Sequence, residues 1–88
     1  MKIDKDALAA NPVRLLRKRL GYTRADFARV TNCPYSTLTR AELGLTNILP
    51  HQVVLAAERL GEDAPALAGA YVEWRMRLRD AYEKKERA

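Results

Sequence analysis

The sequence predicts an all-α fold in a single small domain, and three observations support that prediction. Apolar residues recur at steps of three and four along most of the 88 residues, which is the spacing of one helix face. Asparagine, threonine or proline opens these runs and glycine closes several of them, as at helix ends. No stretch alternates apolar and polar residues long enough to predict a strand.

Two helices are predicted in the first third of the chain. Asn11 can cap the first helix, Pro12 suits its first position, and Gly21 suits the left-handed conformation that follows a last turn. Thr23 can cap the second helix, and Asp26 three residues later completes a pair that resembles a capping box. Each helix is therefore short, and both its ends are marked in the sequence.

A third helix is predicted over residues 35–42. Pro34 must interrupt the second helix, because proline lacks an amide hydrogen and clashes with the preceding turn, but it can open the next one. Gly44 ends this third helix. We expect a loop to follow at residues 45–49, with Ile48 tucked into the core.

Two more helices complete the prediction. A fourth is expected between Pro50 and Gly61, and a long fifth over roughly residues 64–84. The chain then divides into an N-terminal arm at residues 1–10, a four-helix domain at residues 11–62 and a C-terminal helix at residues 63–88.

Positive charge is concentrated in one segment. The chain carries a net charge of +5, yet residues 11–40 hold seven basic side chains and one acidic side chain, a net +6. Such an uneven field favours a polyanionic partner, nucleic acid first and an acidic membrane surface second; a merely solvated basic face is the alternative. No run approaches the roughly 18 apolar residues of a membrane span, so we expect a cytoplasmic protein that does not enter membranes.

The residue types needed for catalysis or metal binding are scarce. Cys33 is the only cysteine and His51 the only histidine, which excludes an internal disulfide and a Cys/His zinc site. Cys33 is expected to be a buried, inert thiol and His51 a surface residue. No nucleophile with a base, phosphate-binding glycine loop or carboxylate pair stands out, so we expect no enzyme, metal or cofactor.

The second and third helices are joined by a turn short enough for a helix-turn-helix. Such a pair needs a small residue where the helices cross, a residue in the turn that tolerates the left-handed conformation, and a branched apolar residue inside the second helix. Ala28, Asn32 and Leu38 meet these needs at spacings of four and six residues. The second helix of such a motif can lie in the DNA major groove.

At these residues the sequence resembles the Cro/repressor-type helix-turn-helix family, also called the XRE or lambda-repressor-like family. The resemblance covers residues 12–61. LLRKRLGYTRADFA is similar to the family's opening block, NCPYSTLTRAELG to its helix-turn-helix block and VVLAAERLG to its closing block. All three blocks fall in one register without a gap. The resemblance implies a five-helix domain of the lambda-repressor type that binds double-stranded DNA.

The resemblance also implies which side chains read bases. Family members use exposed residues at the start of the third helix, and the matching positions here are Tyr35, Ser36, Thr37, Thr39 and Arg40. Arg40 can bind guanine O6 and N7 with two hydrogen bonds, worth about 1–3 kcal/mol of discrimination. The alternative for Ser36 and Thr37 is that they only satisfy the free amides of the first turn.

Contacts to the DNA backbone are implied at four positions. Arg24 matches a phosphate-contacting position of the family, with a solvated arginine as the alternative. Thr23, Thr46 and Asn47 are weaker candidates for the same kind of contact.

One ion pair is implied as a structural element. In the family, an arginine of the first helix meets the glutamate of an E-x-G ending, and Arg17 and Glu42 stand at these positions. The pair would tie the first helix to the end of the third without touching DNA.

The fifth helix carries a long apolar stripe made of Leu67, Tyr71, Trp74, Leu78 and Ala81. The candidate contacts to a second copy are Tyr71, Trp74, Leu78 and Tyr82. A helix of some twenty residues spans about 30 Å, longer than a four-helix globule of about 25 Å, so its end is expected to project. A second copy of the chain can cover the stripe, because helix-turn-helix proteins bind paired half-sites as symmetric dimers. The alternative is that the helix folds back over the first helix as plain core.

Together these features predict a small sequence-specific regulator. It would be a bacterial or phage repressor-like protein that binds an inverted repeat of double-stranded DNA as a homodimer. One alternative is an antitoxin, which binds DNA and also a partner toxin. Another, from a different class, is a protein-interaction module that does not bind DNA.

Overall fold

The computed structural model describes residues 5–87, with side chains for residues 6–81. Throughout this range the regular structure is helical, which confirms the predicted all-α class. The helices are α1 (Lys5–Ala9), α2 (Pro12–Arg19), α3 (Arg24–Thr31), α4 (Tyr35–Glu42), α5 (His51–Arg59) and α6 (Ala64–Arg87). Helices α2 to α6 correspond to the five that the sequence predicts, and α1 is additional.

Helix α1 lies in the segment predicted to be an N-terminal arm. Five residues are too few for a stable helix in isolation, so tertiary contacts must hold it. Ala7 and Leu8 pack against the core, and the indole Nε1 of Trp74 donates a hydrogen bond to the carbonyl of Ala7 at 2.7 Å. That contact joins residues 67 positions apart, which local sequence signals do not reveal. Residues 1–4 of the predicted arm lie outside the described part of the chain.

The helix ends form where the sequence predicts them. The side chain of Asn11 accepts a hydrogen bond from the amide of Val13, and Thr23 Oγ1 accepts one from the amide of Asp26 at 3.1 Å. Asn32 adopts the left-handed conformation with a φ of 54° at the end of α3. These local interactions set the lengths of the short helices around the turn.

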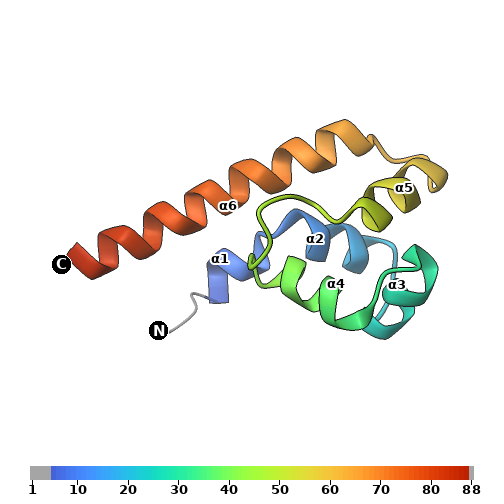
Figure 1. Cartoon of the computed structure of the whole chain (residues 1–88), viewed down its shortest axis with the longest axis horizontal. Helices are drawn as coiled ribbons and strands as arrows, with labels where there is room; N and C mark the ends of the chain where they lie inside the picture. Colours follow the sequence, from blue (N-terminus) through green and yellow to red (C-terminus); the bar gives the residue numbers. More distant parts are fainter. Residues whose placement is uncertain (1–4, 88) are drawn as a thin grey trace.

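Helix α6 runs along one side of the domain and projects beyond it, while α3 and α4 lie on the side away from α6 (Figure 1). The molecule is correspondingly elongated, with extents of 44 × 23 × 20 Å. Tyr71, Trp74 and Leu78 of α6 are buried in the common core. The other large members of that core come from the smaller helices and include Val13, Leu16, Phe27, Leu38 and Val53.

The loop between α4 and α5 passes close to α6. Gly44 has a φ of +74°, and a Cβ at this position would lie 2.8 Å from Leu78 Cδ2, so glycine is required for both conformation and space. The expectation that Ile48 tucks inward is wrong, because its side chain is 70% exposed and Leu49 is buried instead. The Thr46 hydroxyl is hydrogen-bonded to the Tyr71 hydroxyl at 2.8 Å. The next buried side chain along this loop is that of Leu49.

Candidate nucleic-acid interface

Helices α3 and α4 are joined by the turn Asn32-Cys33-Pro34. The amide of Cys33 donates to the carbonyl of Ala28 at 3.0 Å, which closes the end of α3 and starts the change of direction. Ala28 is buried beneath the turn, and Leu38 is completely buried on the inner face of α4. The three residues that the sequence singles out for a helix-turn-helix therefore occupy the expected places.

The outer face of α4 is polar and accessible. Tyr35 is 53% exposed, and Ser36 and Arg40 are exposed as well. Thr37 and Thr39 are partly buried, and the Thr39 hydroxyl oxygen is buried with no hydrogen bond among the described residues. Three of the five predicted base-reading side chains thus project outward, and the Thr39 hydroxyl does not reach the surface. The helix begins without a side-chain capping hydrogen bond.

Glu42, at the end of α4, interacts with two arginines. Arg17 Nη2 donates to Glu42 Oε1 at 2.9 Å and Arg17 Nε to Oε2 at 3.1 Å, which is the ion pair expected from the sequence. Arg24 Nε lies 3.4 Å from Glu42 Oε2, an interaction that sequence reasoning missed. The Glu42 side chain is only 1% exposed and that of Arg24 is 33% exposed. Arg24 Nε is therefore buried beside the carboxylate without forming a hydrogen bond among the described residues, while the side chain still reaches the surface.

The other predicted phosphate contacts divide into two groups. Asn47 is exposed on the loop after α4. Thr23 is exposed, but its hydroxyl caps α3, and the Thr46 hydroxyl is bound to Tyr71 inside the domain. Asn47 and Arg24 thus have polar atoms accessible for an outside partner, whereas Thr23 and Thr46 already use their hydroxyl groups internally.

The C-terminal end of α4 is bound by side chains from outside the helix-turn-helix. Asn11 Nδ2 donates to the carbonyls of Ala41 at 3.0 Å and Glu42 at 2.9 Å, and the Tyr71 hydroxyl lies 3.2 Å from the same Ala41 carbonyl. Arg75 Nε donates to the carbonyl of Gly44 at 3.2 Å. The sequence identified Asn11 only as a cap of α2, because a capping side chain does not reveal where its second polar group points.

Comparison with protein families agrees with this geometry. The family model described as helix-turn-helix matches residues 13–67, which is more than half of the chain. The chain belongs to the XRE-type helix-turn-helix family. Comparisons with curated proteins and with solved structures found no match. The XRE-type family consists of DNA-binding transcription regulators rather than enzymes, and the chain is a DNA-binding regulator of this type.

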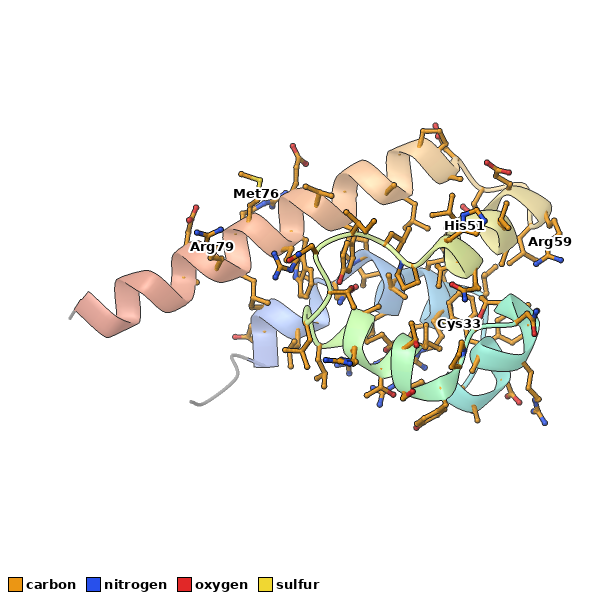
Figure 2. All side chains as sticks on the ribbon, viewed as in Figure 1. Cys33, His51, Arg59, Met76 and Arg79 are labelled. Carbon is orange, nitrogen blue, oxygen red and sulfur yellow. The ribbon has the colours of Figure 1, made fainter. Side chains whose placement is uncertain are left out.

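Three of the four dimer candidates of this XRE-type protein lie inside one chain. Tyr71, Trp74 and Leu78 are buried against the smaller helices, so they present no surface to a second copy. These three residues instead follow the alternative given for the fifth helix, in which it packs against the domain as part of the core. The side chain of Tyr82 lies outside the described residues. Met76, on the opposite face of α6, points away from the body of the domain (Figure 2).

The remaining singled-out residues carry no catalytic arrangement. Cys33 is buried at the turn, and burial raises the pKa of its thiol, which disfavours the reactive thiolate. His51 is exposed at the start of α5 (Figure 2). In the described residues, no cluster of three or more His, Cys, Asp or Glu side chains can hold a metal ion. Nor is any helix there long and apolar enough to cross a membrane.

Proposed function

We propose that this regulator binds a specific DNA sequence by placing α4 in the major groove, and that it represses transcription by occluding a promoter. The observation that carries the proposal is the two-sided character of α4. Its inner residues Leu38 and Ala41 are completely buried, while Ser36 and Arg40 project from the opposite face and Tyr35 is exposed at the start of the helix. An eight-residue helix of this kind presents its side chains to base edges without losing its packing.

Arg40 is the principal base-reading residue in this proposal. It lies in the last turn of α4, exposed and with donors that match guanine O6 and N7. Ser36 lies one turn earlier on the same face, where its hydroxyl can accept or donate. Tyr35 lies at the start of the helix, from which its ring can contact a thymine methyl group. Together they can contact neighbouring base pairs.

Backbone contacts position α4 in this complex. Arg24 lies at the start of α3 beside Glu42 and Asn47 on the loop after α4, so both residues can contact phosphates near the C-terminal end of the reading helix. Arg14 and Lys18 add long-range attraction that does not depend on sequence.

The proposed complex is a homodimer on an inverted repeat. Half-sites one DNA turn apart, about 34 Å, place two reading helices in successive major grooves, so the copies must meet beyond one end of α4. The loop at the C-terminal end of α4 carries two strongly exposed apolar residues, Leu45 and Ile48. A second copy that packs on this loop would cover both residues and place the helices in that arrangement.

Selection from a pool of random duplex DNA at near-physiological salt tests the proposal. Enrichment of an inverted repeat supports sequence-specific binding by a dimer, and its half-site spacing reports the dimer geometry. Absence of enrichment, together with absence of binding at low salt, would instead favour a protein-interaction module. A protein that co-purifies with the chain and modulates its DNA affinity would favour the antitoxin alternative.

A further inference from the structure

Three side chains from outside the helix-turn-helix bind the C-terminal end of α4, and we call Asn11, Tyr71 and Arg75 the collar. The last carbonyls of a helix have no partner within the helix and need donors from elsewhere. Asn11 Nδ2 supplies both of its hydrogens, to the carbonyls of Ala41 and Glu42. Tyr71 adds a donor at Ala41, and Arg75 binds the carbonyl of Gly44 directly after the helix.

The two inner members of the collar are completely buried and fully used. Asn11 Oδ1 accepts from the amide of Val13 at 2.8 Å, so the amide group is held at three points and ties the start of α2 to the end of α4. The Tyr71 hydroxyl lies within hydrogen-bond distance of the Thr46 hydroxyl and of the carbonyls of Ala41 and Thr46, and it accepts from Thr46 when its own hydrogen points to a carbonyl. A hydrogen bond in this buried, low-dielectric environment is stronger than the same bond exposed to water.

Together with the Arg17–Glu42 ion pair, the collar supplies the directional side-chain contacts that hold α4. The helix spans eight residues, about 12 Å, and begins without a side-chain capping hydrogen bond. Leu38 and Ala41 hold it through apolar burial, which is non-directional and tolerates small rotations and shifts. Hydrogen bonds weaken steeply with misalignment, so the collar restricts both the rotation and the axial position of the helix.

We propose that Asn11 and Tyr71 are positioning residues for sequence reading, which act by holding α4 in a single orientation although neither touches DNA. The inference rests on the proposed function, in which α4 contacts bases. A bidentate contact to a base tolerates little displacement, whereas charge attraction to phosphates falls off slowly with distance. Loss of the collar should therefore reduce specific binding much more than non-specific binding.

Tyr71→Phe in the full chain is the first test, because it removes one hydroxyl oxygen and keeps the ring. Affinities are measured for the selected operator and for a scrambled duplex of equal length, at a temperature where circular dichroism shows both proteins folded. We expect operator affinity to fall roughly fivefold or more, the lower end of the cost of one lost base contact, with little change on the scrambled duplex. Tyr22→Phe, at a ring stacked on Phe27, is the matched control and should leave both affinities unchanged.

Asn11→Asp provides a second arm with a pH readout. The new side chain keeps the oxygen that caps α2 but places a carboxylate against the carbonyls of Ala41 and Glu42. Protonation restores one donor, so the ratio of operator to scrambled affinity should rise as the pH falls from about 7 to about 5. The same ratio for the unaltered protein, measured in parallel, corrects for any pH dependence of DNA binding itself.

Amide hydrogen exchange in the absence of DNA distinguishes a specific loosening of α4 from a general loss of stability. Tyr71→Phe should accelerate exchange in α4 more than in α3 or α5, whereas a general loss of stability would accelerate all three alike. Unchanged relative exchange in α4 overturns the inference, as does an unchanged affinity ratio in a protein that discriminates. If the unaltered protein does not distinguish operator from scrambled DNA, the proposed function is overturned, and selective acceleration in α4 still supports the collar.

Discussion

Arg24 Nε lies 3.4 Å from Glu42 Oε2, on a carboxylate that Arg17 already engages through Nε and Nη2. One nearly buried negative charge thus serves two positive groups that differ in burial, with the Arg17 side chain 11% exposed and that of Arg24 33% exposed. The more buried arginine connects α2 to the end of α4. Arg24 extends from the same carboxylate to the protein surface beside the reading helix.

Arg17 and Arg24 should therefore differ sharply in their effect on stability. Arg17→Gln leaves the Glu42 carboxylate buried with little compensation, and we expect a loss of about 3–5 kcal/mol in the free energy of unfolding. Arg24→Gln removes a partly solvated partner and should cost less than about 1 kcal/mol. Urea unfolding followed by circular dichroism measures both, and equal losses would contradict the ranking.

Arg24→Gln should also change the salt dependence of DNA binding. If Arg24 neutralises one phosphate, the slope of log affinity against log salt should become shallower by about 0.9. Arg77→Gln on the exposed face of α6 is the control and should leave the slope unchanged. An identical slope for Arg24→Gln and the unaltered protein would remove Arg24 from the interface.

Arg40→Ala should relax the sequence preference at a single base position. We expect the loss of about 1–3 kcal/mol to fall on duplexes that carry the preferred base there, because only those offer the bidentate contact. Affinities for the four duplexes that differ at that position provide the measurement. Uniform weakening on all four would mean that Arg40 contacts only phosphate.

Ile48→Glu should weaken the proposed dimer without unfolding the chain. The side chain is mostly exposed, so a charge there costs little in the monomer but cannot be buried between two copies. Leu55→Glu, at an exposed leucine of α5, is the control. Sedimentation should show a lower mass for Ile48→Glu than for the unaltered protein or for Leu55→Glu. If the unaltered protein is itself a monomer at high concentration, the proposed dimer is excluded.

The buried hydroxyl of Tyr71 should make the folded protein less stable at alkaline pH. Burial raises the pKa of its hydroxyl above the ordinary value of 10.0, so the unfolded chain releases this proton at lower pH than the folded chain. The contribution to stability is fully present below about pH 10 and is lost as the pH rises through the folded-state pKa. Tyr71→Phe should show a smaller decline in unfolding free energy above about pH 10, and parallel pH profiles for the two proteins would contradict this expectation.

Interactions between residues close in sequence were predictable. The caps at Asn11 and Thr23, the left-handed Asn32 and the burial of Leu38 follow from local spacing and stereochemistry, and each appears in the structure. The pairing of Arg17 with Glu42 came from the family resemblance, because no local rule joins residues 25 positions apart.

Tertiary contacts decided what local patterns left open. The apolar stripe of α6 specified a buried face but not its partner, and the stripe packs on its own domain because Tyr71 and Trp74 also find hydrogen-bond acceptors there. Helix α1 and the collar on α4 likewise depend on contacts between residues 30 or more positions apart. The sequence by itself determined that the segments of α2 to α6 are helical and where the short helices α2 to α5 end, since those properties depend on neighbouring residues. Only the tertiary structure decided how α4 is held, because its donors come from distant segments that meet only after the chain has folded.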